Sequence, residues 1–364
     1  MSGGVRGWWT IWRVRRRLDL ARYWVAHADL NEAARHGDRA LRLTRDRPGM
    51  PAALTALAAL TMGQIEQDRA RFPASVTYLA MAVAVLDAEP IGPDRDRLLG
   101  RALTDLGDAH RRGGRYPEAA PVLQQAQRLL ETADAPNAGG LAAVLTAQAI
   151  MAKELGQVDR AAHLYARVQH IQDRAGTAVA DAATLLHNLA GLAYTRQRYP
   201  QAEAYARRAV THRQTAAGPD TVEVAADLAV LAAAVAAQHR HDEARAYLNK
   251  ALAICRAARP PRDYEIAVQT HTLAAIDHAD GRLASAEFGY REALAAKQRL
   301  LGSDHPEIAV LANNLGTLLQ QADRDTEAAE CYRHAMTIAE RAYGPTHPTT
   351  VTIGHNAALT RRLP

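Results

Sequence analysis

The chain has 364 residues, of which 48% are hydrophobic and 5% aromatic, and it carries a net charge of +5 with a pI of about 9.3. Its basic residues are interleaved with 39 acidic ones, which favours protein binding over binding to the phosphate backbone of nucleic acid. Cys255 and Cys331 are too few and too far apart to indicate a disulfide framework or a metal site. No apolar stretch reaches the roughly 18 residues that a membrane span needs. We therefore expect a cytoplasmic protein without metal or cofactor.

The first 30 residues are predicted to form a helix rich in tryptophan and arginine that leads into the first repeat. They contain all four tryptophans of the chain and a basic run from Arg13 to Arg17. Such a helix can lie on a membrane surface, dock a partner, or cap the apolar side of the first repeat. We favour the cap, because the first repeat of a stacked array needs one. As an alternative, a secondary interaction surface would consist of Trp8, Trp9, Trp12 and Arg16.

From residue 12 onward, strong helix formers predominate and the alternating pattern of strands is missing, which predicts an all-α protein. A period of 42 residues relates Glu223, Glu265 and Glu307, and it also relates the segments 302–306 and 344–348. Each unit divides into an A helix and a B helix joined by a short turn. We predict eight such pairs near 12–46, 50–89, 94–133, 138–174, 178–216, 220–258, 262–300 and 304–342, followed by a terminal helix near 348–361.

Small residues recur at three points of every unit. On the A helices the column consists of Ala21, Gly63, Gly107, Ala149, Ala190, Ala232, Ala274 and Gly316. Two further columns run along the B helices and begin at Ala33 and Ala40. Two antiparallel helices can approach closely only where their crossing points carry little bulk. The three columns therefore predict tightly nested helix pairs.

This pattern resembles the tetratricopeptide repeat (TPR), and the Gly-x-Asp-His-Pro segment at 302–306 resembles its kinesin light chain subtype. The resemblance implies an all-α, right-handed α-solenoid of about eight TPR-like repeats over 12–342, with a capping helix and tail at 346–364. Abundant arginine and alanine are typical of a high-GC genome, so we expect an actinobacterial source.

The resemblance also implies that the A helices line a concave groove that holds a peptide. In the C-terminal half, the residues mapped to the groove are His187, Asn188, Tyr194, His271, His278, Asn313, Asn314 and Gln320. Val230 and Thr272 interrupt the asparagine pattern in two middle repeats. In the N-terminal half, the mapped residues are Arg101, Asp108, Arg111 and Lys153. Each of these four charged side chains taken alone fits a solvated helix face with internal salt bridges better than a binding site. For the groove as a whole we favour binding.

No dinucleotide-binding, phosphate-loop or His-Glu-x-x-His motif is present in the sequence. We therefore predict a non-catalytic scaffold or adaptor for a protein or peptide partner. Two alternatives remain, a peptide- or ligand-sensing regulator of transcription or of an enzyme, and a scaffold that self-assembles as a homodimer.

Overall fold

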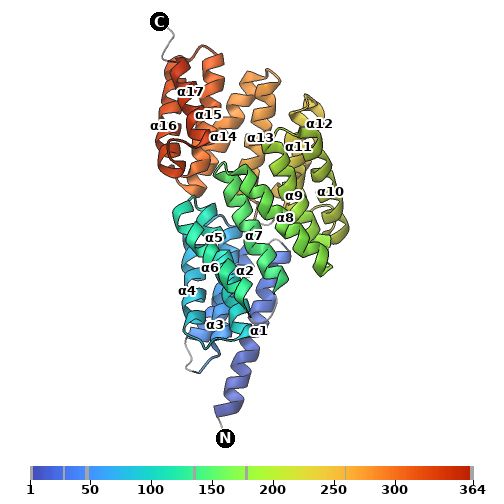
Figure 1. Cartoon of the computed structure of the whole chain (residues 1–364), viewed down its shortest axis with the longest axis vertical. Coiled ribbons are helices and arrows are strands. Elements are labelled where there is room, and N and C mark those ends of the chain that lie inside the picture. Colours follow the sequence, from blue (N-terminus) through green and yellow to red (C-terminus); the bar gives the residue numbers. More distant parts are fainter. Residues whose placement is uncertain are drawn as a thin grey trace. The chain divides into compact units, whose positions relative to one another are not determined.

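The computed structural model describes residues 3–27, 29–45, 49–133, 137–176, 179–258 and 260–360. Within these ranges the chain forms seventeen helices (Figure 1). The A helices are α1 (Gly3–Ala26), α3 (Ala52–Asp68), α5 (Pro93–Arg112), α7 (Ala138–Glu154), α9 (Val179–Thr195), α11 (Val222–Ala236), α13 (Asp263–Ala279), α15 (Pro306–Gln321) and α17 (Pro348–Thr360). The B helices are α2 (Leu30–Arg45), α4 (Phe72–Asp87), α6 (Tyr116–Thr132), α8 (Val158–Ala175), α10 (Tyr199–Ala217), α12 (His241–Ala257), α14 (Leu283–Leu301) and α16 (Asp325–Tyr343). The prediction of an all-α solenoid of eight helix pairs and a terminal helix is confirmed.

The chain divides into two compact units. Unit 1 comprises residues 1–148 with 258–260, and unit 2 comprises residues 149–257 with 261–364. The boundary falls inside α7, so the first part of this helix belongs to unit 1 and its end to unit 2. None of the described helices is both long enough and hydrophobic enough to cross a membrane.

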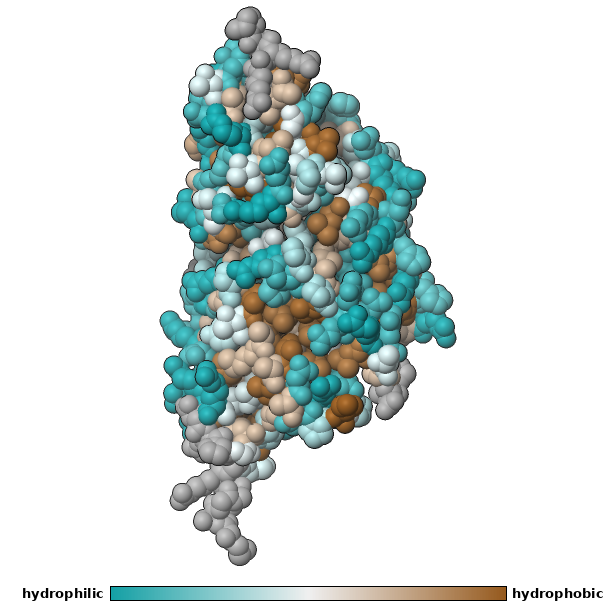
Figure 2. All heavy atoms as spheres, turned by 60° about the vertical axis from the view of Figure 1, so that its left-hand side comes forward, coloured by the Kyte–Doolittle hydropathy of each residue, from teal (hydrophilic) through white to brown (hydrophobic). Residues whose placement is uncertain are grey.

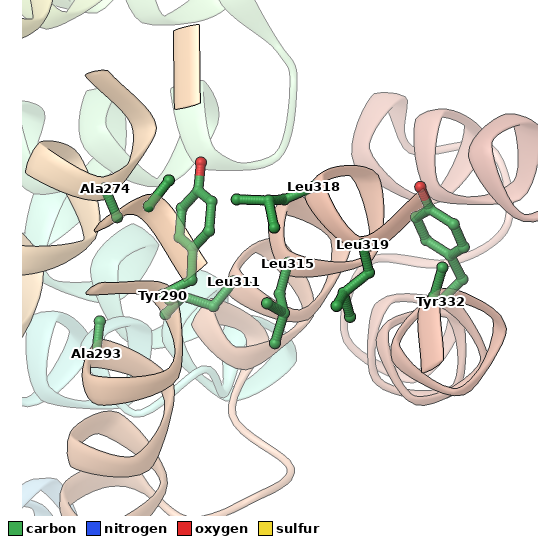
Figure 3. Close-up of a cluster of buried hydrophobic side chains, with 10 residues drawn as sticks. Ala274, Tyr290, Ala293, Leu311, Leu315, Leu318, Leu319 and Tyr332 are labelled. Atoms are coloured by element: carbon green, nitrogen blue, oxygen red, sulfur yellow. The ribbon is translucent and has the colours of Figure 1, made fainter. Parts of the chain in front are cut away.

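The three columns of small residues lie where the helices of each pair cross. Every residue of the A-helix column is buried, and so are the equivalents of Ala33 and Ala40 in all eight repeats. The lack of bulk is a steric requirement at Gly316, because a Cβ there would lie 2.8 Å from the ring carbon Cε1 of Tyr332 on the paired helix. Figure 3 shows the core at this end of unit 2, with leucines of α15 lying between the buried rings of Tyr290 and Tyr332.

The turn between the A and B helices has the same backbone conformation in seven repeats. One residue per turn has a positive φ, and these residues are Ala70, Gly114, Gly156, Gln197, His239, Gly281 and Asp323. The N–H of the following residue donates to a carbonyl five residues earlier, as Arg198 does to Ala193 at 2.9 Å. This is the hydrogen bond of a Schellman cap, which satisfies a carbonyl that the helix end leaves without a partner. A common cap gives each B helix the same starting direction.

The His-Pro pairs start α15 and α17 by a shared capping mechanism. Nδ1 of His305 accepts from the N–H of Glu307 at 3.3 Å, and Nδ1 of His347 accepts from the N–H of Thr349 at 3.1 Å. The proline that follows each histidine occupies the first helical position, where a missing N–H costs nothing. Nε2 of His347 also donates to the carbonyl of Glu154 at 3.0 Å, which links the end of α7 to the start of α17 within unit 2.

The helix α1 packs on the first repeat through its aliphatic residues, and its first three tryptophans take no part in this packing. Val14, Leu18 and Ala21 of α1 are buried against the first repeat, whereas Trp8 and Trp9 are 62% and 54% exposed. Because a helix turns by about 100° per residue, Trp9 lies on the side of the helix opposite to Leu18, and Trp8 lies about 80° around the helix from it.

The outer side of the second repeat is also hydrophobic. Unlike the other B helices, α4 carries no charged residue before its last position, Asp87. Several of its apolar side chains, including those of Val76, Ala80 and Val83, are at least partly exposed. Figure 2 shows hydrophobic residues gathered in the lower half of the face that it draws.

Candidate functional site

The A helices lie on the inner side of the curve within each unit. In unit 1, α3 contacts both α1 and α5, and in unit 2 the A helices from α9 to α17 contact one another in succession. The B helices of successive repeats make no comparable contacts among the described residues. The A helices are therefore more closely spaced than the B helices, which places their free faces on the concave side. This is where the predicted groove residues are found.

A ladder of hydrogen-bonded side chains crosses three successive A helices of unit 2. Nδ2 of Asn314 on α15 donates to Nε2 of His271 on α13 at 3.0 Å. Nδ2 of Asn313 approaches Oδ1 of Asn314 at 3.4 Å, and Oδ1 of Asn313 accepts from Nδ2 of Asn356 on α17 at 2.9 Å. We call His271, Asn313, Asn314 and Asn356 the amide ladder.

His271 of α13 contributes a neutral imidazole to this surface. Burial and the nearby Lys297 ammonium lower the pKa of His271 to about 3, so its ring is uncharged at neutral pH. Its Nε2 accepts the bond from Asn314, which leaves the ring proton on Nδ1. Two helical turns later, Nε2 of His278 lies 2.8 Å from Oε1 of Gln321 on α15. Gln320 accepts from the hydroxyl of Tyr332 at 3.1 Å.

The start of unit 2 holds a buried ion pair behind the groove. The carboxylate of Asp227 on α11 is fully buried, and it lies 2.7 Å from Nδ1 of His187 on α9 and 2.7 Å from Nε of Arg213 on α10. Asn188 is 8% exposed and so presents little of its surface. Tyr194, by contrast, is 41% exposed, with its ring 5.5 Å from that of Tyr199. Of the α9 residues assigned to the groove, Tyr194 is the most accessible to a ligand.

Unit 1 presents charged groups at the corresponding positions. Oδ2 of Asp105 on α5 accepts from Gln64 on α3 at 3.0 Å, and Arg101 also donates to Gln64 at 3.1 Å. Burial raises the pKa of Asp105 to about 6, although Arg101 acts in the opposite direction. Burial also favours the neutral form of Asp108, but Arg111, bonded to it at 2.7 Å, and Arg112 outweigh this effect and lower its pKa.

Lys153, which was grouped with these residues, belongs to unit 2. It lies near the end of α7, and a Cβ on Gly191 of α9 would lie 3.1 Å from its Nζ. The helix α7 therefore brings a cation against the next A helix at a position where α9 has no side chain.

Sequence reasoning missed several members of these networks, among them Asp105, Asp227 and Asn356 on the A helices. The signal for Asn356 was available, because it follows Asn314 by one period of 42 residues. Asp105 and Asp227 share their helices with other acidic residues, Asp108 and Glu223, and no spacing rule distinguishes the bonded ones from solvated ones. Within the described residues, no three His, Cys, Asp or Glu side chains are grouped as metal ligands.

Comparison with known proteins identifies the repeat. Tetratricopeptide repeat models match residues 102–134, 181–257, 265–340 and 307–363, which together amount to more than half of the chain. No curated protein sequence gives a significant match.

Among solved structures, a Rap conjugation gene regulator of the plasmid pLS20 in complex with the Phr* peptide is 12% identical, with a TM-score of 0.65 over 90% of this chain and 95% of the other. The apo form of the quorum sensor NprR from B. thuringiensis is 14% identical, with a TM-score of 0.58 over 89% and 87% of the two chains. A putative kinesin light chain with TPR-like repeats from Podosopora anserina is 19% identical, with a TM-score of 0.42 over 51% and 88% of the two chains. The columns, the caps and the matching repeat models together show that this chain belongs to the tetratricopeptide repeat family.

Proposed function

We propose that the protein is a non-catalytic scaffold that holds an extended peptide against the A helices of unit 2. The observation that carries this proposal is the amide ladder, which spans α13, α15 and α17. A peptide in extended conformation presents N–H and C=O groups along its length, and it needs donors and acceptors spaced along its binding surface.

The ladder fits such a backbone because its groups are neutral and their direction is fixed. Each asparagine amide has two N–H groups, and the bonds described above use one of them. The neighbouring contacts fix the orientation of each amide, which lowers the entropy cost of binding. His271 stays uncharged because its pKa is about 3, so the ladder adds no charge that would select for ionic side chains. The exposed ring of Tyr194 would add an apolar contact at the α9 end.

A regulatory role for this binding is the second candidate, and the comparisons support it. The Rap structure and a second NprR structure contain a bound peptide, and both share the fold of this chain over most of its length. Under this hypothesis the bound peptide is a signal, and the protein passes it on to a transcription factor or an enzyme. The charged surface of unit 1 around Asp105 and Asp108 would then be available for a protein partner.

The test is a selection of random 12-residue peptides displayed on phage against the purified full chain, followed by calorimetric titration of the selected peptides. We expect Tyr194→Ala and Asn314→Ala each to weaken binding about tenfold, since a lost contact of about 1.4 kcal/mol corresponds to this factor. The matched control is Phe288→Ala, which removes an aromatic ring that is 72% exposed on a B helix of the same unit.

Far-UV circular dichroism of each variant would verify that the helices are intact. If the selected peptides bind both groove variants as tightly as the wild type, the groove is not the binding site. If the control loses affinity to the same extent, the binding surface lies on the B helices.

A further inference from the structure

The excess positive charge of the protein is concentrated in one helix. Residues 1–27 contain six arginines and a single acidic residue, Asp19, for a net charge of +5. This equals the net charge of the whole chain, so the rest of the sequence carries equal numbers of basic and acidic residues. The same helix contains all four tryptophans. The net positive charge and the indole rings are thus confined to α1, and the positive and negative charges of the repeats that follow are equal in number.

The helix presents these side chains on the face that points away from the repeat. Its buried face consists of Thr10, Val14, Leu18 and Ala21. On the opposite face, Trp8, Trp9 and Trp12 are 62%, 54% and 42% exposed, and Arg13, Arg15 and Arg16 are exposed beside them. We call Trp8, Trp9, Trp12, Arg13, Arg15 and Arg16 the Trp-Arg stripe.

The side chains of the stripe contact one another and leave its outer surface open. The ring of Trp9 lies edge-on to the rings of Trp8 and Trp12, with centroids 5.7 and 5.8 Å away. The guanidinium of Arg16 lies 5.3 Å from the centroid of Trp12, within the range of a cation–π contact. Three adjacent exposed indoles form an apolar patch of the kind that marks an interaction surface.

We propose that the Trp-Arg stripe docks the protein onto an anionic lipid surface. Indole rings are amphipathic and favour the headgroup level of a bilayer, where the ring is buried and its N–H remains hydrated. The arginines alongside would pair with lipid phosphates and with the excess negative charge of anionic headgroups. The only acidic side chain of the helix, that of Asp19, lies 3.5 Å from Arg22 and is compensated by it.

The shape of the stripe favours a lipid surface over a protein groove. Its aromatic and basic residues occupy the outer side of one helix, whose inner side is anchored to α2 and α3. A helix in this arrangement can lie flat on a surface with its apolar side chains inserted, as interfacial helices do. This function is separate from peptide binding in unit 2, and it would hold the scaffold at a membrane.

The native tryptophans provide the assay, because all four lie in α1 and their fluorescence reports on this helix alone. The full chain is titrated with vesicles of phosphatidylcholine and with vesicles that also contain one quarter phosphatidylglycerol. We expect the emission to shift to the blue with the anionic vesicles only, and we expect added salt to reverse the shift because it screens the arginines.

Co-sedimentation with the same anionic vesicles then compares variants. Trp8→Ala/Trp9→Ala/Trp12→Ala is expected to lower the partition coefficient at least tenfold. Each of Arg13→Gln and Arg15→Gln is expected to lower it about fivefold. The control Ile91→Ala/Phe288→Ala removes two exposed hydrophobic side chains elsewhere and is expected to bind like the wild type.

The proposal is overturned if the wild type ignores anionic vesicles, if it binds neutral vesicles equally well, or if the tryptophan variant binds undiminished. It is also overturned if light scattering without lipid shows a dimer that the tryptophan variant abolishes, because the stripe would then be a contact between two copies of the chain.

Discussion

Replacement of Arg213 by leucine should loosen the start of unit 2. The carboxylate of Asp227 is fully buried and has two partners, Arg213 and His187, each at 2.7 Å. In Arg213→Leu the carboxylate would stay buried without its guanidinium. Removal of one partner from a buried ion pair typically costs about 3–5 kcal/mol, because an uncompensated charge remains in the interior. The cost falls locally, since repeats contact mainly their neighbours.

Hydrogen exchange measures this cost where it arises. We expect amides of α9, α10 and α11 to exchange about a hundredfold faster or more in Arg213→Leu, while amides of α3 and α5 in unit 1 keep their rates. Adding Asp227→Asn should restore much of the protection, because the buried charge is then gone. The reasoning would be refuted by a change below fivefold in α9–α11, or by a double variant less protected than Arg213→Leu alone.

Three further predictions concern the turns, the core and the unit 1 network. Gln197 has a φ of 58°, which is unfavourable for residues other than glycine, so Gln197→Gly should raise the free energy of unfolding in urea by about 0.5–1 kcal/mol. The control Gln125→Gly, within α6, should lower the free energy of unfolding by about 1 kcal/mol. Gly316→Ala should lower the melting temperature, because the added Cβ would meet the buried ring of Tyr332 at 2.8 Å; an unchanged or raised value would contradict the close crossing. The pKa of Asp105 is raised to about 6, so the folded state binds its proton more tightly than the unfolded state, and stability should fall as pH rises from about 4 to 6. Asp105→Asn should therefore exceed the wild type in stability at pH 7 by about 3 kcal/mol and lose this advantage at pH 4.

The helix pairs could be predicted from the sequence because their requirements are local. A crossing point admits only a small side chain, so the columns through Ala21, Ala33 and Ala40 mark the crossings. The turns could be predicted in part, because they too depend on local backbone geometry. Gly156 and Gly281 have the positive φ that favours glycine, but His239 adopts the same conformation and carries no comparable signal.

The contacts between repeats were not predictable, because they depend on partners about 35 residues apart. The position after the second column is Glu203, Arg245 and Glu287 in three successive repeats. In each repeat this side chain bonds to the opposite charge of the next one, as Glu203 does to Arg240 and Arg245 does to Asp277. The charge at this position thus alternates in sign over these three repeats. An alignment of the repeats shows only that the charge at this position changes sign from one repeat to the next. It does not show that the residue of opposite charge that bonds to it lies in the following repeat.

The sequence predicted which residues lie at the candidate site but not which hydrogen bonds they form. The mapping placed Asn313, Asn314 and His271 on the A helices, and the structure brings these side chains together. The mapping from the sequence did not reveal that these side chains bond to one another. For the Trp-Arg stripe, the choice between the two sides of α1 depended on what packs against Val14 and Leu18, and helical spacing alone does not supply this information.

Asn356 provides the sharpest test of whether the ladder acts as a unit. Its Nδ2 donates to Oδ1 of Asn313 at 2.9 Å, and it is the one residue of the amide ladder that lies on α17. Asn356→Ala removes one of the two side-chain bonds that orient the Asn313 amide, but it removes no bond between α13 and α15. If the ladder orients its amides for a peptide, affinity for the selected peptides should fall about threefold to tenfold, the equivalent of one hydrogen bond. Exchange rates in α13 should meanwhile stay unchanged. An unchanged affinity would mean that the peptide site ends at α15, and faster exchange in α13 would mean that the ladder holds the repeats together and does not serve binding.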